Sequence, residues 1–290
     1  MGSSDNPQFE PQPVVSAEPA PIAVDLGVGP PVTQLPEVAR LARDPVWSGW
    51  DVLLITLLTV GTVIVVESLV AVGLWGFVYQ HSSLVDVLRK PVVALAGQFL
   101  SYIVVALVMV MFVEGKYRAP FWQAIRWSWP SSNMKLMGLL LIGMLTVALD
   151  ILSRFLPMPK TSPFDEFFAH PREAYLTAAF AVTLGPLIEE LLFRGFLYPV
   201  LARRTGAVAA VVLTALPFGL IHYLQYQSWS AVLVVGLVGV VLAVVRAVTK
   251  SVAASFLVHV GYNGTLMCLM ALQTDGFRHM PKAFACFRLP

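Results

Sequence analysis

The sequence predicts an all-α fold, a polytopic membrane protein built as a helical bundle of about seven transmembrane helices. Of the 290 residues, 57% are apolar and only 12% are charged, whereas a soluble domain carries about 25% charged residues. Several apolar runs approach the ~20 residues that a helix needs to cross a bilayer. The net charge is only +2 and no basic stripe is present, which argues against nucleic acid as a partner. The expected surroundings are therefore the lipid bilayer.

Composition divides the chain into three parts. Residues 1–45 are rich in Pro, Ala, Val and acidic residues without periodicity, which predicts a disordered, proline-rich N-terminal tail. Residues 46–272 contain the apolar runs and form the predicted transmembrane bundle. Residues 273–290 are of mixed composition and are expected to lie on the surface as a C-terminal tail.

The spans follow from apolar runs separated by polar or charged connections. The fourth run covers about residues 176–201, and its helix is expected to continue past the membrane to Arg204. Glu67 in the first span and Asp150 in the third are ionisable residues without an assigned role. The remaining six spans are expected at about residues 50–78, 92–113, 136–156, 207–225, 231–245 and 252–272.

The distribution of Lys and Arg predicts the orientation of the bundle. Arg203 with Arg204, Arg246 with Lys250, and the segment 114–135 fall at the same end of the spans. In that segment basic residues alternate with tryptophans, a pattern typical of a membrane interface. The excess of basic residues places this end and the N-terminus in the cytoplasm, and the C-terminus outside. We expect a multi-pass integral protein of a prokaryotic plasma membrane.

The fourth span carries three ionisable side chains in an otherwise apolar run. Each costs roughly 2.5–3.5 kcal/mol at membrane depth, so such residues indicate a functional site. Glu190 and Arg194 are four residues apart and should form an ion pair on one helix face. Glu189 is rotated about 100° from Glu190 and has no such neighbour. The run thus offers one neutralised carboxylate and one that is free for chemistry.

Two later spans contain polar pairs at helical spacing. Phe218 and His222 share a face of the fifth span, and His259 and Asn263 share a face of the seventh. Glu189 and His222 each lie about 25 Å along a helix from the turn between their spans, hence at nearly the same depth. His259 lies at the same depth as Glu189 and His222 if the hairpin that carries Arg203 and Arg204 projects about 10 Å beyond the bilayer.

A carboxylate beside an imidazole, away from bulk water, is an arrangement for general-base catalysis. Glu189 and His222 could together deprotonate a water molecule that attacks a carbonyl carbon. His259 and Asn263 could offer N–H donors where the oxyanion forms, which is often the largest catalytic contribution. The expected chemistry is hydrolysis of an amide inside the membrane.

These residues resemble the three motifs of the CPBP or Abi family, the CAAX proteases and bacteriocin-processing enzymes. The motifs read Glu189-Glu190-x-x-x-Arg194, Phe218-x-x-x-His222 and His259-x-x-x-Asn263, on successive late membrane helices. The resemblance covers about residues 136–272, which we expect to be the catalytic core. It implies a glutamate-dependent intramembrane endopeptidase similar to the type II CAAX prenyl endopeptidase. By this resemblance Glu189 and His222 would activate water, and His259 and Asn263 would bind the oxyanion.

The resemblance also implies supporting residues and partners. Glu190 and Arg194 would brace the helix or help to bind substrate, while Phe218 is expected to form a pocket wall. No cofactor is expected, because better-studied members of the family are metal-independent and no His-Glu-x-x-His motif is present; a divalent metal is the alternative. The expected partner is a membrane-associated peptide or protein substrate.

Two other functions compete with proteolysis. A catalytically silent binding or immunity protein is the first alternative, although such a protein would not need all four of Glu189, His222, His259 and Asn263. A transporter is the second, with Glu67 and Asp150 flanking an ion route. Pro186 and Pro217 interrupt two spans, but no internal repeat accompanies them, as transporter folds would require.

Overall fold

The computed structural model describes residues 45–280, and all regular structure in this range is helical. Seven spans are long and apolar enough to cross a membrane, which confirms the predicted fold class. They are α2 (Gly49–Phe77), α4 (Pro91–Tyr117), α6 (Ser132–Arg154), a fourth span over Pro171–Thr205, α10 (Ala207–Ile221) with α11 (Tyr223–Tyr226), α12 (Trp229–Thr249) and α13 (Val252–Gln273). Three short elements lie in the connections: α3 (Leu84–Leu88), α5 (Phe121–Ala124) and the 3-10 helix η1 (Pro163–Phe168).

The two predicted tails fall largely outside the described residues. Of the N-terminal tail expected over residues 1–45, the structure describes only Pro45. Of the C-terminal tail expected over residues 273–290, it describes the residues up to 280. Both remain predictions.

The fourth span is assembled from four consecutive segments and is not one uninterrupted helix. These are α7 (Pro171–Val182), α8 (Leu184–Glu190), the π-helical segment η2 (Leu191–Leu197) and α9 (Tyr198–Thr205). The break at Thr183 lies three residues before Pro186, whose ring has no N–H to donate and clashes with the carbonyl four residues earlier. Pro217 behaves differently, because it lies inside α10 and the helix continues past it. The expected break at Pro217 is therefore wrong: α10 packs closely along α12, which holds the helix together despite one missing hydrogen bond.

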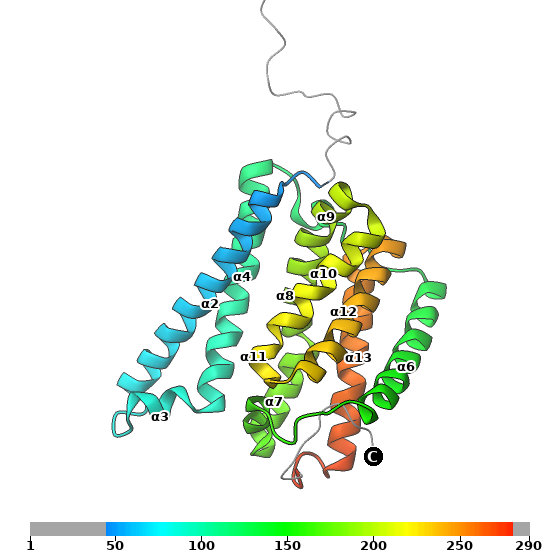
Figure 1. Ribbon diagram of the computed structural model, residues 1–290. Helices are drawn as coiled ribbons and strands as arrows, with labels where there is room; N and C mark the ends of the chain where they lie inside the picture. The colour runs from blue at the N-terminus through cyan, green and yellow to red at the C-terminus, as the bar shows by residue number, and fades with distance from the viewer. Residues whose placement is uncertain (1–44, 281–290) are drawn as a thin grey trace, which may run out of the picture.

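The fourth span separates two groups of helices (Figure 1). Helices α2 and α4 form a pair on one side, whereas α10, α12, α13 and α6 pack together on the other. One buried apolar core joins α2 and α4 to η2 through residues such as Phe196, and a second joins α6, α10, α12 and α13 around Phe218. Large apolar side chains such as Leu69 and Leu139 stay exposed on the outside. That surface suits a lipid environment, because aliphatic side chains cost nothing to expose to lipid tails.

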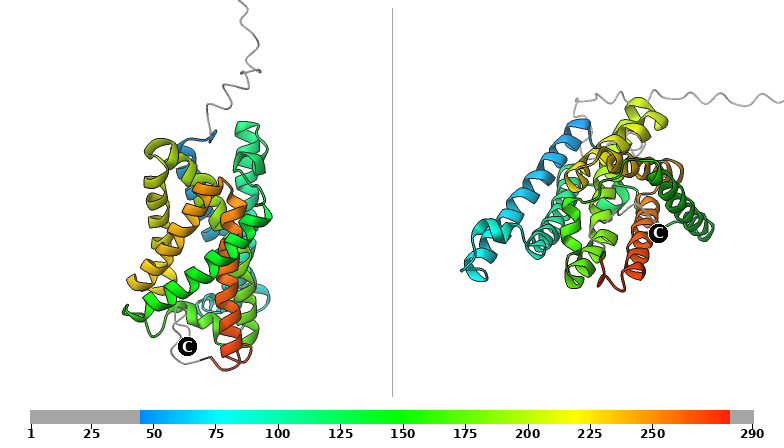
Figure 2. Two further views of the ribbon diagram at one scale, coloured as in Figure 1. Left: turned by 90° about the vertical axis from the view of Figure 1, so that its right-hand side faces the viewer. Right: turned by 60° about the horizontal axis from the view of Figure 1, so that its bottom comes forward.

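Polar contacts gather at the end of the bundle where α2 begins and α9 ends (Figures 1 and 2). Arg203 donates hydrogen bonds to the carbonyl oxygens of Pro45 and Trp47, at 2.6 and 3.0 Å. Near the start of α2, Asp51 accepts hydrogen bonds from Lys116 and Tyr117 at the end of α4. The basic residues that predicted the orientation thus lie at one end of the molecule. The assignment of this end to the cytoplasm remains a prediction.

Helices α10 and α12 lie close together at Gly219. A Cβ atom at this position would lie 3.0 Å from both the Gly236 Cα atom and the Val232 carbonyl oxygen. We expect Gly219→Ala to lower the free energy of unfolding by about 1–3 kcal/mol, the usual effect of overpacking a well-packed contact, measured as a lower thermal midpoint in detergent. Gly143→Ala on α6 is the matched control, because a Cβ there meets no atom within 4 Å. An equal midpoint for both variants would contradict the close contact.

Candidate active site

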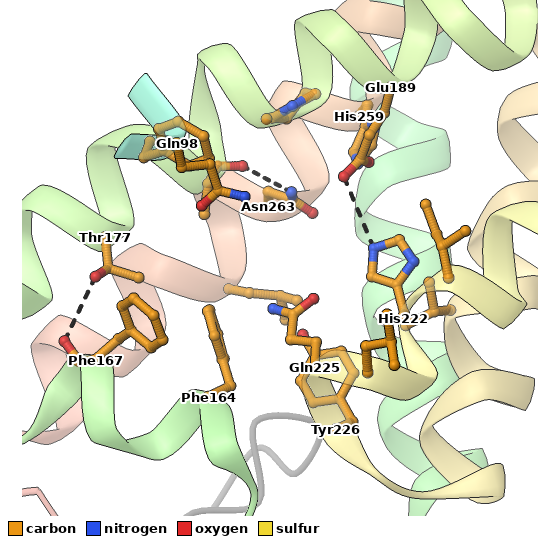
Figure 3. A pocket seen from close by; sticks show the side chains of 18 of the residues that line it. Gln98, Phe164, Phe167, Thr177, Glu189, His222, Gln225, Tyr226, His259 and Asn263 are labelled. Carbon is orange, nitrogen blue, oxygen red and sulfur yellow. Dashed lines mark hydrogen bonds and ion pairs between the residues drawn. The ribbon is translucent and has the colours of Figure 1, made fainter. Parts of the chain in front are cut away.

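Three helices bring Glu189, His222 and His259 together inside the bundle. Glu189 lies near the end of α8, His222 directly follows α10, and His259 lies in α13. The Oε1 atom of Glu189 is 3.8 Å from His222 Nε2, and its Oε2 atom is 3.7 Å from His259 Nε2. Figure 3 shows the three side chains turned toward one another. Helix depth and motif order predicted that these residues share one site, and the structure places the carboxylate between the two imidazoles.

The hydrogen bonds of the two histidines define where their protons lie. His222 Nδ1 is 2.7 Å from the carbonyl oxygen of Phe218, and a carbonyl can only accept, so Nδ1 carries a proton. The Nε2 atom of a neutral His222 then presents a lone pair toward Glu189. His259 Nδ1 is 3.1 Å from Glu190 Oε1 and donates to that carboxylate. The two imidazoles are thereby held in place with their Nε2 atoms facing Glu189.

Glu190 and Arg194 form the predicted ion pair behind this centre. Arg194 Nη1 donates to Glu190 Oε1 at 2.9 Å, and both side chains are fully buried. Arg194 also donates to the carbonyl oxygen of Gly239 on α12, at 2.8 Å. Arg246 of α12 in turn donates to the backbone carbonyl of Arg194, at 3.1 Å. The pair thus links the fourth span to α12 as well as to His259.

The remaining predicted residues lie beside the centre. Asn263, one turn beyond His259 on α13, lines the same cavity and donates one amide proton to the carbonyl oxygen of Ala181, at 2.8 Å. Its second amide proton remains available as a donor. Phe218 is buried, and its ring lies 5.0 Å from that of His222 and 5.9 Å from that of His259. It therefore forms part of the wall, as predicted.

A cavity of about 590 Å³ gives access to this centre. It lies between α4 on one side and α10 with α11 on the other, and Phe164 and Phe167 of η1 line one end. Glu189 remains 21% exposed within it and His222 14% exposed, so water and substrate can reach both. The cavity volume lies in the range of about 300–1,000 Å³ that is typical of ligand sites.

Several contacts of the site could not be predicted from the sequence or were not. The hydrogen bond between His259 and Glu190 could not, because the two residues come from different helices 69 positions apart. Gln98 and Tyr102, which line the cavity from α4, were not predicted either. A signal for them was present, since two polar residues four apart in an apolar span share one helix face. Glu67 of α2 lines the cavity as well.

Asp150 takes no part in the cavity. Its carboxylate accepts two hydrogen bonds from Arg154, one turn later on α6, at 3.0 and 3.1 Å. It is not among the lining residues. Asp150 therefore does not share this cavity with Glu67.

The fold and the site define a class of protein, a polytopic membrane protein with a carboxylate and two imidazoles at an internal cavity. A family model described as type II CAAX prenyl endopeptidase Rce1-like matches residues 171–265. This match supports membership of the CAAX protease or CPBP family and an intramembrane protease kind of function. Neither the search of curated proteins nor that of solved structures gave a match.

Proposed function

We propose that this protein is a glutamate-dependent intramembrane endopeptidase that hydrolyses a peptide bond of a membrane-associated substrate. The observation that carries the proposal is the position of the Glu189 carboxylate between His222 Nε2 and His259 Nε2, at the surface of a cavity. The family match supports the same kind of reaction.

In the proposed reaction, Glu189 and His222 activate the attacking water. Their facing atoms are 3.8 Å apart, too far for a direct hydrogen bond but close enough for one water molecule to donate to both. The carboxylate and the Nε2 lone pair would then accept a proton as the water oxygen attacks the carbonyl carbon. The same pair would return a proton to the leaving amine.

His259 and Asn263 are proposed to stabilise the oxyanion. His259 donates Nδ1–H to Glu190, so it presents an N–H at Nε2 only as an imidazolium. The free amide proton of Asn263 would be the second donor. Two such donors aimed at the developing charge stabilise the transition state without rearrangement.

Metal independence is part of the proposal, and one experiment tests it together with the reaction. Membranes that contain the wild-type protein or the Glu189→Gln variant are compared by proteomics of peptide termini, with and without a chelator. We expect a set of termini that disappears in the variant and persists with the chelator. Termini lost on chelation would contradict metal independence. Identical profiles for the two proteins would overturn the protease assignment and favour a binding or immunity protein.

A further inference from the structure

Glu67 is a second carboxylate at the same cavity, and the proposed reaction does not use it. It lies in the middle of α2, where an ionisable group is costly and therefore indicates a function. No side chain within residues 45–280 forms a hydrogen bond or an ion pair with it, whereas Asp51 on the same helix is bound by Lys116 and Tyr117. Glu67 is partly exposed and lines the cavity. Its carboxylate is therefore free to bind a ligand.

Gly97 of α4 allows Glu67 to reach the cavity. A Cβ atom at residue 97 would lie 3.0 Å from the Glu67 Cγ atom and 3.1 Å from its Cα atom. A Cβ atom at residue 97 would crowd Glu67, which would have to shift by a few tenths of an ångström. The absence of a side chain at residue 97 thus brings α2 close enough to present Glu67 beside the polar face of α4.

Gln98 and Tyr102 complete this polar wall. The two residues are one turn apart on α4, and Gln98 Nε2 donates to the Tyr102 hydroxyl at 3.3 Å. The Tyr102 ring is held against Phe180, with 5.1 Å between the ring centroids. The amide oxygen of Gln98 and the hydroxyl oxygen of Tyr102 are hydrogen-bond acceptors. Together with the Glu67 carboxylate they form a group of acceptors on the α2 and α4 side of the cavity, while Glu189 and His222 come from other helices.

Among residues 45–280, no Lys or Arg side chain that lines the cavity balances the Glu67 carboxylate on the α2 and α4 wall. None of its lining residues, all within 45–280, is Lys or Arg, whereas Glu67 and Glu189 both line it. The nearby guanidinium of Arg194 is fully buried and pairs with Glu190. A substrate group that enters the cavity therefore meets acceptors and negative charge. A carboxylate would find no cationic partner on this wall. An ammonium or guanidinium would find an anionic partner in Glu67.

We propose that Glu67, Gln98 and Tyr102 form a subsite for a basic side chain, Lys or Arg, of the peptide substrate. This proposal rests on the proposed function, because it names the kind of peptide that the protease would select. The terminal ammonium of a lysine has three donors and no acceptor, which matches three acceptors on one wall. The long apolar stem of Lys or Arg suits the remaining lining, which is largely apolar.

Peptide binding tests this subsite without requiring cleavage. The protein carries Glu189→Gln, so that bound peptides stay intact, and is placed in lipid nanodiscs. Fluorescently labelled, N-acetylated peptides of one apolar sequence carry Lys, norleucine or Glu at the central position, and their Kd values are measured by anisotropy. A norleucine peptide with a free N-terminus shows whether an α-amino group can replace the side chain.

We expect the Lys peptide to bind about tenfold more tightly than the norleucine peptide, the effect of one charge-assisted hydrogen bond, and the Glu peptide to bind most weakly. Adding Glu67→Gln should bring the Lys-to-norleucine ratio to about one, and Gln98→Leu should lower it in part. Glu114→Gln removes the same charge from α4 outside the cavity and should preserve the ratio. Equal Kd values in the starting protein, or a Lys preference that survives Glu67→Gln, would overturn the subsite. The failure of the protease assignment would appear separately, as identical termini profiles.

Discussion

Glu189→Gln and His222→Ala are each expected to reduce peptide cleavage by about 10²–10⁴-fold, the usual contribution of a positioned general base. Glu189→Gln replaces the carboxylate by a neutral amide, which cannot act as a base toward water. His222→Ala removes the Nε2 atom that faces Glu189 at 3.8 Å. The measurement is the initial rate with a cleaved substrate, for purified protein reconstituted in liposomes.

A lower rate reports on catalysis only if each variant still folds as the wild type does. Both side chains are partly exposed at the cavity, so we expect the thermal midpoint and the elution profile of each variant to match the wild type. Glu173→Gln, at the start of α7 and outside the cavity, is the matched control and should keep the full rate. Cleavage at the wild-type rate in either active-site variant would refute the assignment of water activation to these residues.

Glu190→Ala is expected to lower the free energy of unfolding by about 3–5 kcal/mol, because it leaves the buried Arg194 charge without its partner. The side chains of both residues are completely buried. The same change removes the acceptor of His259 Nδ1. We expect a lower yield and a lower thermal midpoint in detergent, together with a loss of activity through the misplaced imidazole.

The double variant Glu190→Leu with Arg194→Met separates these two effects. Breaking a buried pair is costly, whereas replacing both partners by apolar residues of similar size is often neutral or stabilising. The native pair also leaves Glu190 Oε2 and Arg194 Nε without a hydrogen-bond partner among residues 45–280. We therefore expect the double variant to regain much of the stability but not the activity. A fully stable Glu190→Ala protein would instead show that the pair has no bracing role.

Local regularities made much of this protein predictable from sequence. Apolar runs of span length, compared with the ~20 residues that cross a bilayer, predicted seven membrane helices, and residues 45–280 contain seven such spans. The spacing of Glu190 and Arg194 predicted their ion pair, because residues four apart always share a helix face. Counting 1.5 Å per residue from their common turn predicted that Glu189 and His222 lie at one depth, and that His259 joins them if the hairpin with Arg203 and Arg204 projects about 10 Å beyond the bilayer. Their motif order also predicted the family that the comparison supports.

Only the tertiary structure decided which face each helix turns toward the others. Rotation about a helix axis depends on packing with distant segments, so the contact of His259 with Glu190 and the cavity wall of Glu67, Gln98 and Tyr102 could not be read from helical periodicity. The same holds for Pro217, which packing of α10 on α12 accommodates within the helix. The sequence by itself determined the spans, their order and the depth of the reactive groups, because these depend on length and local spacing. Packing between helices decided which atoms face Glu189 and what chemistry the cavity offers to a substrate.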